Sequence, residues 1–274
     1  MSDFEVEYLA DGLIFHLNRP AKLNAITKPI LEGLTGCIDE LEAQAVGEHQ
    51  RVLIISGRGP KAFCAGTDLA ETSASPKPER LNKSAMARDL FVRLSRSPLI
   101  SVAAINGLAF GGGLELAMAC KFRVAATYAS FSLPEIKLGL LPAYGGTQLL
   151  PALVGKQRAR DIMLTGRVLG VQEALAIGLI DRVSGAHSAS AAGTNDEVPS
   201  ALLSDALGLA RSITCFSPLA MTAIEECLEA AGFEVTDEGL AIEDAAVRRL
   251  FVSDDAQEGV AAFLEKRVPK FKGS

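Results

Sequence analysis

The stretch from residue 98 to residue 120 limits the possible folds of this chain more than any other. It reads PLISVAAINGLAFGGGLELAMAC and is almost wholly apolar, with a length that would span a bilayer as one helix. The pair Asn106-Gly107 and the glycines at 111–113 would break such a helix, and Glu115 would lie inside the membrane. The pattern therefore predicts a buried strand, a tight loop and a buried helix.

Short apolar runs alternate with segments of helical periodicity over the first two thirds of the chain. Strands are expected at residues 4–9, 13–18, 51–56, 99–105, 121–126 and 179–183. Helices are expected at 29–46, 81–96, from 112, and at 146–153, 156–164, 172–177, 201–213, 217–231, 235–251 and 254–266. Residues 131–147 indicate an ordered loop, and the low-complexity segment 184–200 indicates a surface linker. This order predicts an α/β fold followed by an all-helical tail.

The composition excludes several classes of protein. Of the 274 residues, 49% are hydrophobic, which excludes a disordered chain, and 25 Gly with 5 Cys exclude a collagen-like or disulfide-stapled scaffold. With 27 basic and 33 acidic residues the net charge is −6, so nucleic acid is not an expected partner. The odd number of cysteines predicts reduced thiols in a cytoplasmic protein, and three scattered histidines predict no metal site. The acidic N-terminal segment does not have the pattern of a signal peptide.

Two glutamates stand alone in apolar surroundings. Glu115 is the only charged residue between 98 and 120, and Glu135 is the only one between 124 and 136. Burying a charge without a partner is costly, so each carboxylate is either hydrogen-bonded for structure or placed for chemistry. The purely structural interpretations are equally open: Glu115 favours the positive end of its helix, and Glu135 is a turn residue that faces solvent. If the two converge, they can divide acid and base roles, with Glu115 held ionised by helix amides and Glu135 more easily protonated.

Two segments place small residues around glycine, at 62–69 (AFCAGTDL) and 106–113 (NGLAFGGG). Backbone N–H groups can point outward there without a side chain in the way. Two such donors aimed at one oxygen would form an oxyanion hole, whereas the simpler interpretation is two tight turns. Neither segment fits the GxGxxG dinucleotide fingerprint, and the chain has no GxxxxGK[ST] phosphate loop.

At these residues the sequence resembles the enoyl-CoA hydratase/isomerase (crotonase) superfamily, and most closely its true hydratases. The matching segments follow the family's order over nearly the whole chain: LNRPAKLNAIT (17–27), RVLIISGRGPKAFCAGTDL (51–69), INGLAFGGGLELAMAC (105–120), FSLPEIKLGLLPAYGGTQLL (131–150), LTGRVLGVQEALAIGLIDRV (164–183) and EGVAAFLEKRVPKF (258–271). The resemblance implies a crotonase-like spiral of β-β-α units over residues 1–199 and a helical oligomerisation region over 200–274. It also implies assembly as homotrimers or as dimers of trimers.

The resemblance implies an acyl-CoA site. The thioester carbonyl would lie between the backbone N–H groups of Thr67 and Gly112, and Glu115 and Glu135 would position and activate one water. The residues expected to line the substrate and CoA path are Lys22, Leu23, Ala25, Ala65, Asp68, Leu69 and Ala143. Ala143 stands where many hydratases have glycine, and Thr67 where alanine is common, which implies a narrower site near the thioester. No metal or other cofactor is implied, since CoA enters as part of the substrate.

Binding an anionic CoA to a chain of net charge −6 requires local cations. Arg19 and Lys22 are the candidates in the first matching segment. The basic tail at 266–272 is a further candidate, and a solvated, solubilising end is the other interpretation of it.

The resemblance thus implies a hydro-lyase that adds water reversibly across the 2,3 double bond of a 2-enoyl-CoA to give a 3-hydroxyacyl-CoA. Two alternatives stay open: an enoyl-CoA isomerase or another lyase of the same superfamily, and a non-catalytic acyl-CoA-binding protein on the same scaffold. The presence of both glutamates favours hydration. The expected partners are an acyl-CoA and further copies of the chain, without nucleic acid or membrane.

Overall fold

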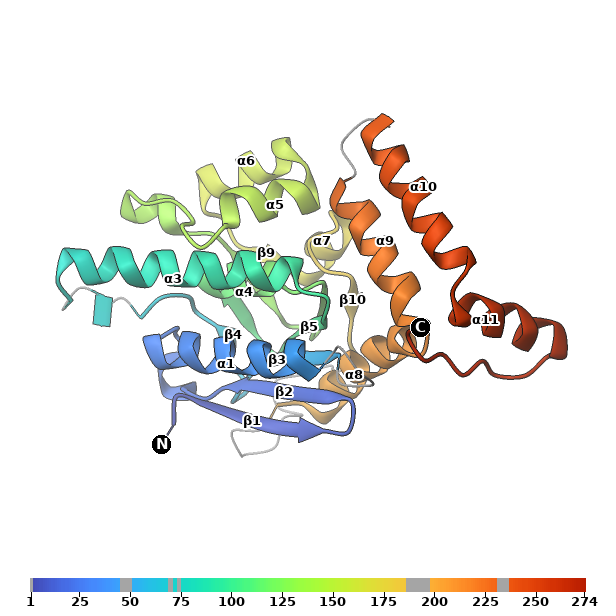
Figure 1. The fold of residues 1–274 in the computed structure, drawn as a ribbon. Helices are drawn as coiled ribbons and strands as arrows, with labels where there is room; N and C mark the ends of the chain where they lie inside the picture. Colours follow the sequence, from blue (N-terminus) through green and yellow to red (C-terminus); the bar gives the residue numbers. More distant parts are fainter. Residues whose placement is uncertain (1, 45–50, 69–70, 73–74, 186–197, 231–236) are drawn as a thin grey trace.

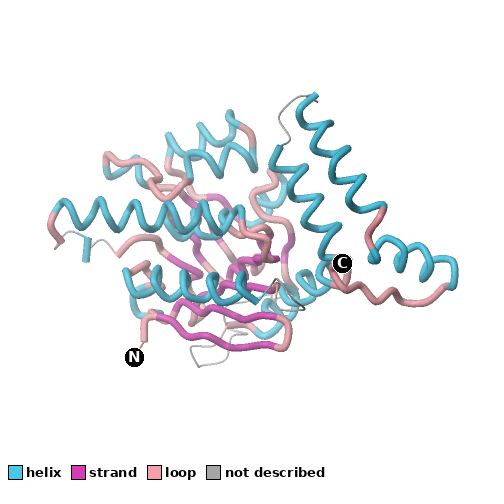
Figure 2. The backbone as a smooth tube through the Cα atoms, viewed as in Figure 1, coloured by secondary structure: helices cyan, strands magenta, loops and turns pink. Residues whose placement is uncertain are grey.

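A computed structural model describes the whole chain except residues 1, 45–50, 69–70, 73–74, 186–197 and 231–236. Strands lie at its centre with helices around them (Figure 1, Figure 2). The strands are β1 (Phe4–Leu9), β2 (Gly12–Leu17), β3 (Val52–Gly57), β4 (Ala62–Cys64), β5 (Ile100–Ile105), β6 (Leu108–Phe110), β7 (Phe122–Ala125), β8 (Ser130–Ser132), β9 (Leu169–Gly170) and β10 (Arg182–Val183). Within the described residues they form a six-stranded sheet, β1-β2-β3-β5-β7-β10, and a four-stranded sheet, β4-β6-β8-β9.

The helices fall close to the ranges expected from periodicity. They are α1 (Lys28–Gln44), α3 (Lys77–Arg96), α4 (Gly112–Ala119), α5 (Gly146–Val154), α6 (Lys156–Thr165), α7 (Val171–Ala176), α8 (Ser200–Thr214), α9 (Pro218–Ala230), α10 (Asp237–Phe251) and α11 (Asp254–Glu265). Two short 3-10 helices are η1 (Pro20–Lys22) and η2 (Glu135–Leu138). Most of the surface linker expected at 184–200 lies outside the described residues.

A unit of two strands and a helix repeats along the chain. β3, β5 and β7 lie in the larger sheet, the strands that follow them, β4, β6 and β8, lie in the smaller sheet, and α3, α4 and α5 come next. β2, β3, β5, β7 and β10 run parallel to one another, as such crossovers require, and β1 pairs antiparallel with β2 at the edge of this sheet. The expected α/β fold with a spiral of β-β-α units is confirmed.

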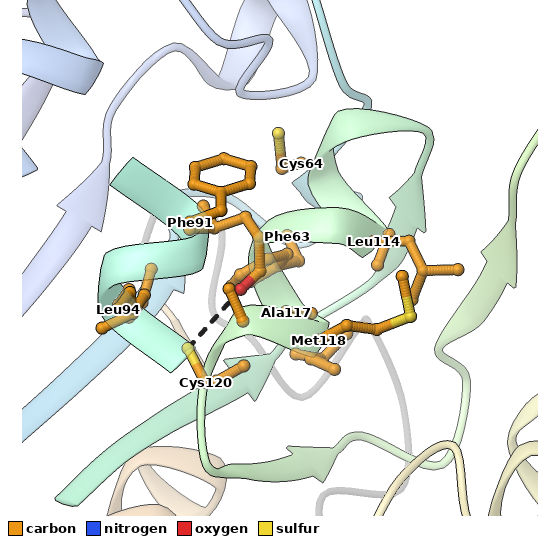
Figure 3. Close-up of a cluster of buried hydrophobic side chains, with 14 of the residues drawn as sticks. Phe63, Cys64, Phe91, Leu94, Leu114, Ala117, Met118 and Cys120 are labelled. Atoms are coloured by element: carbon orange, nitrogen blue, oxygen red, sulfur yellow. Dashed lines mark hydrogen bonds between the residues drawn. The ribbon is translucent and has the colours of Figure 1, made fainter. Parts of the chain in front are cut away.

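The larger sheet is covered on both faces. Leu13, Phe15 and Leu17 of β2 point into a core shared with α1, α3 and α4, whereas Ile14 points to the opposite face and packs with α8. Figure 3 shows part of the first core, where Phe63, Phe91 and Leu114 meet from β4, α3 and α4. This packing holds the start of α4 against the smaller sheet.

A buried asparagine sets the turn that leads into the second glycine segment. The Asn106 side chain donates to the carbonyls of Gly57 and Gly59 at 2.6 Å each, and its oxygen accepts from Gly57 N at 3.2 Å. At Gly107, an added Cβ would lie 2.3 Å from the carbonyl oxygen of Lys61, so no larger residue fits there. The Asn-Gly pair therefore ties β5 and β6 to the segment that precedes β4.

The C-terminal helices divide into two groups. α8 packs against β3, β5 and β7, whereas α9, α10 and α11 extend to one side of the sheets (Figure 1). The expected division at residues 199 and 200 stays a prediction. No single helix of the described chain is long and apolar enough to cross a membrane. Only α8 and α9 taken together meet that length and composition, and they are bent by 98°.

Candidate active site

The candidate site is built around the first turn of α4. Gly111 adopts a φ of 52°, a conformation that favours glycine, and its N–H donates to the carbonyl of Ser132 at 2.9 Å. An added Cβ on Gly113 would lie only 2.1 Å from the carbonyl oxygen of Cys64. The glycines thus let the helix start lie directly against the loop that follows β4.

That loop carries Thr67 toward the same place. Residues 23–26 pair with it, because Ala65 N donates to Leu23 O at 2.9 Å and Ile26 N to Gly66 O at 2.7 Å. An added Cβ on Gly66 would lie 3.0 Å from the backbone nitrogen of Gly112. Within the described residues, neither Thr67 N nor Gly112 N donates a hydrogen bond. The two amides expected to form an oxyanion hole therefore lie close together and are unengaged.

Glu115 lies almost wholly inside the protein, in the first turn of α4, and is 1% exposed. Its Oε1 accepts from Tyr144 N and from Gly146 N at 2.8 Å each, and an added Cβ on Gly146 would lie 2.8 Å from that oxygen. Burial raises the pKa of Glu115 to about 7; the two N–H donors lower it, and the charge of Glu135 raises it slightly. The expectation that helix amides hold Glu115 ionised needs correction: the donors are Tyr144 N and Gly146 N, the latter at the start of α5, and burial outweighs their effect on the pKa.

Glu135 opens the 3-10 helix η2 and is half-buried. Its Oε1 would lie 2.9 Å from a Cβ built on Gly111, so the carboxyl covers the residue that precedes Gly112. Its Oε2 is buried without a hydrogen-bond partner in the described structure, and burial raises its pKa. The interpretation of Glu135 as a solvent-facing turn residue is therefore wrong. Both glutamates meet at the start of α4.

Tyr144 is a site residue that the sequence did not reveal. Besides its N–H bond to Glu115, its hydroxyl lies 2.5 Å from Thr67 Oγ1, and its ring packs edge-on against Phe91 at 5.8 Å. The side chain is 6% exposed, and burial raises its pKa. The chain has only 3 tyrosines, and one of them between Ala143 and a Gly-Gly pair was the available signal.

The residues expected along the substrate path lie on two adjoining segments. Residues 22–25 and 65–68 are brought together by the pairing described above, with Lys22 exposed and Ala25 buried. Ala143 is exposed, and its N–H makes no hydrogen bond within the described part of the chain. Leu69 lies outside the described residues.

The Arg19 guanidinium is held in ion pairs and hydrogen bonds, so its role is structural. Its Nη1 donates to Asp68 Oδ2 at 2.9 Å and to the carbonyl of Ala25 at 3.0 Å, and its Nε lies 3.4 Å from Asp3 Oδ1. Two carboxylates thus neutralise the guanidinium and hold the paired loops together. Of the two cations expected in this segment, Lys22 is the exposed one.

The basic tail folds back on α11. Arg267 pairs with Glu258 at 2.6 Å, and Glu258 also accepts from Lys270 N at 2.7 Å. The buried Asp255 accepts from the backbone N–H of Lys272 at 2.7 Å and from the hydroxyl of Ser217 at 2.6 Å. The backbone of the tail is therefore fastened to α11, and Asp255 in turn joins α11 to the residue before α9.

The arrangement offers two unengaged amides and two carboxyl groups around one point, which suits stabilisation of an oxyanion with proton transfer beside it. All five cysteines are free thiols. Among the described residues, no group of three or more His, Cys, Asp or Glu side chains could hold a metal ion.

Comparisons with known proteins agree with this chemistry. A family model described as enoyl-CoA hydratase/isomerase matches residues 13–274. The 2,3-dehydroadipyl-CoA hydratase of Escherichia coli (strain K12) is 37% identical over 273 residues, covering 100% of both chains. An enoyl-CoA isomerase/hydratase of Zymoseptoria tritici is 37% identical over 273 residues, covering 100% of this chain and 87% of the other. The crystal structure of an enoyl-CoA hydratase from Bacillus anthracis matches with a TM-score of 0.87 at 34% identity, covering 99% of this chain and 100% of that one.

Proposed function

Because the chain belongs to the enoyl-CoA hydratase/isomerase family, we propose that it adds water reversibly to the 2,3 double bond of a 2-enoyl-CoA, giving a 3-hydroxyacyl-CoA. The observation that carries the proposal is the meeting of Glu115 and Glu135 at the start of α4, beside the unengaged amides of Thr67 and Gly112. Hydration needs one group to take a proton and another to give one, and this site holds two carboxyls.

In the proposed reaction, the water oxygen bonds to C3 while one carboxylate takes a proton from the water. The π electrons move toward the thioester oxygen, and the amides of Thr67 and Gly112 stabilise the resulting enolate-like charge. The other carboxyl group gives its proton to C2. The active pair must therefore hold one proton between its two members, and burial raises the pKa of both carboxyls.

The test is direct turnover of crotonyl-CoA, followed by loss of the conjugated thioester absorbance. Glu115→Gln and Glu135→Gln should each lower kcat by about 100-fold or more, in line with general acid–base contributions. Glu32→Gln is a matched control, because Glu32 lies exposed on α1. Near-normal hydration by either site variant would contradict its role. Acyl-CoA binding without any turnover would favour a non-catalytic binding protein.

Double-bond isomerisation is the second candidate, since the Zymoseptoria tritici relative is called an enoyl-CoA isomerase/hydratase. The same amides would stabilise the enolate, and a single glutamate could move a proton between C2 and C4. A 3-enoyl-CoA substrate separates the two reactions, because isomerisation creates conjugated absorbance and hydration removes it. Conversion of the 3-enoyl-CoA without hydration of crotonyl-CoA would replace the hydratase assignment.

A further inference from the structure

We propose that Tyr144 is a positioning residue: its hydroxyl, bonded to Thr67 Oγ1, holds the two oxyanion amides and the Glu115 carboxyl in one geometry. The inference rests on the proposed function, because it concerns the same site. It starts from the finding that these three groups come from two segments: Thr67 lies in the loop after β4, whereas Gly112 and Glu115 lie at the start of α4.

Tyr144, in the loop before α5, is in contact with both segments. Its backbone N–H donates to Glu115 Oε1 at 2.8 Å. Its ring lies against the start of α4, where a Cβ built on Gly112 would be 2.8 Å from Cε2. Its hydroxyl lies 2.5 Å from Thr67 Oγ1, across a sequence separation of 77 residues. Tyr144 thus touches the Glu115 carboxyl through its backbone and both amide-bearing residues through its side chain.

The bond to Thr67 acts on the direction of the Thr67 amide. Threonine is stiff about χ1, so anchoring Oγ1 also restrains the Cα and the peptide unit that carries the N–H. The ring is restrained in turn by Phe91, which meets it edge-on at an interplanar angle of 83°. Preorganised donors stabilise an oxyanion only while they stay aimed at it, and small displacements of catalytic groups lower the rate strongly.

The hydroxyls of Thr67 and Tyr144 share a single hydrogen bond, so one of their two O–H hydrogens is not used in it. Valine at position 67 keeps the branched side chain and phenylalanine at position 144 keeps the ring, and each removes the bond. The bond can therefore be tested by substitutions that change little else.

The experiment compares Tyr144→Phe, Thr67→Val and the double variant in crotonyl-CoA turnover. Each single variant should lower kcat about 3- to 10-fold, the worth of one hydrogen bond, with KM changed less than about 2-fold. The double variant should lose no more than either single one, because both remove the same bond. Thr67→Ser keeps the hydroxyl and should restore most of the rate lost in Thr67→Val.

Tyr128→Phe is the matched control. Tyr128 is partly buried against the α8 side of the larger sheet, and its hydroxyl has no hydrogen-bond partner in the described structure. Its removal should leave kcat unchanged. Thermal unfolding followed by circular dichroism verifies that all variants are folded at the assay temperature.

A second readout does not depend on which reaction the enzyme catalyses. Bound acetoacetyl-CoA has an enolate that absorbs in the near ultraviolet, and the oxyanion amides lower the pH at which it forms. Tyr144→Phe and Thr67→Val should raise that apparent pKa by about 0.5–1 unit, matching the expected change in rate. Wild-type protein that forms the enolate without hydrating crotonyl-CoA would contradict the proposed function alone. Unchanged enolate formation in both variants, or additive losses of kcat, would overturn the role of Tyr144.

Discussion

Glu115 is a carboxyl group that folding makes harder to ionise. Its pKa rises from an ordinary 4.5 to about 7, chiefly because it is buried. Between these values the unfolded chain binds fewer protons than the folded one at this position, so the free energy of unfolding falls as pH rises and levels off above 7. Glu115→Gln should lack this dependence. In urea unfolding, its stability relative to wild type should improve by about 2–3 kcal/mol between pH 5 and pH 8.

The control for this prediction is again Glu32→Gln, whose stability should run parallel to that of wild type at both pH values. Glu115→Gln would then be inactive and yet relatively more stable at pH 8, as expected where a site keeps a strained group for chemistry. Equal pH dependence in wild type and Glu115→Gln would show that the burial of Glu115 does not shift its ionisation.

Glu135 acts on Glu115 through its charge. A neighbouring carboxylate disfavours a second negative charge, and the charge of Glu135 contributes to the raised pKa of Glu115. Glu135→Gln removes that repulsion, so the pKa of Glu115 should fall by less than about one unit, burial being the larger cause. Infrared titration of the carboxyl band that Glu115→Gln abolishes measures the shift. An unchanged or raised value would show that the two groups are not electrostatically linked.

At the residue scale, the candidate catalytic residues could be predicted from the sequence, but the contacts between side chains could not. Glu115 and Glu135 stand out because each is the one carboxylate in an apolar stretch. The segments 62–69 and 106–113 stand out for their small residues, but only the family resemblance selects Thr67 and Gly112 within them. Tyr144 did not stand out, since a lone tyrosine carries no pattern and its partner lies 77 residues away. The order of acidity of the glutamates also depends on burial and on the donors at 144–146, which only the folded chain shows.

At the scale of elements, the contact between α4 and β4 holds the site together. Gly113→Ala would place a Cβ 2.1 Å from the carbonyl oxygen of Cys64, so α4 must move away from the loop that carries Thr67. We expect a loss of about 1–3 kcal/mol in stability from overpacking, together with a loss of turnover larger than the fraction unfolded explains. Circular dichroism melting and crotonyl-CoA turnover measure the two effects.

Gly36→Ala is the matched control for this element. Gly36 lies exposed in α1, and a Cβ built on it meets nothing within 4 Å. Alanine there should raise stability by about 0.5–1 kcal/mol, because it restricts the unfolded chain and favours helix. Turnover should stay at the wild-type level. A Gly113→Ala variant as active and stable as Gly36→Ala would mean that α4 tolerates displacement.

Long elements were predictable and short ones were not, for a physical reason. α1, α3 and α8 repeat their apolar positions over several turns, and β3 and β5 are continuous apolar runs. β4, β6 and β8 have three residues each, too few to alternate, and they exist because the larger sheet and the glycine turns place them side by side. The smaller sheet is a product of tertiary structure, and it carries the site.

At the scale of the whole molecule, the net charge of −6 opposes an anionic CoA. Arg19 is neutralised by Asp68 and Asp3, and Arg267 by Glu258 and Glu265, so these guanidiniums cannot supply the attraction from their present contacts. Lys22, exposed beside the paired loops, stays the predicted contact for a phosphate.

The C-terminal helices and the tail expose several large apolar side chains, which is unusual for a monomer. Phe251, Val260, Phe263, Leu264 and Val268 are each 63–82% exposed. A hollow of about 750 Å³, with an almost wholly apolar lining, lies among α8, α9, α11 and the tail. Apolar patches of this kind mark interaction surfaces, and we propose that another copy of this chain covers this one.

We therefore expect light scattering to give a mass of three or six times 28.8 kDa at micromolar concentration. Phe263→Asp should reduce that mass to the monomer. In a closed symmetric assembly the new carboxylate would be buried at every interface, and burying each one costs several kcal/mol. Tyr8→Ser is the control, since it removes a ring that is 65% exposed on the edge strand β1, outside the C-terminal helices, and it should leave the mass unchanged. A wild-type monomer, or a Phe263→Asp variant of unchanged mass, would show that the apolar faces of α10 and α11 do not join copies of this chain.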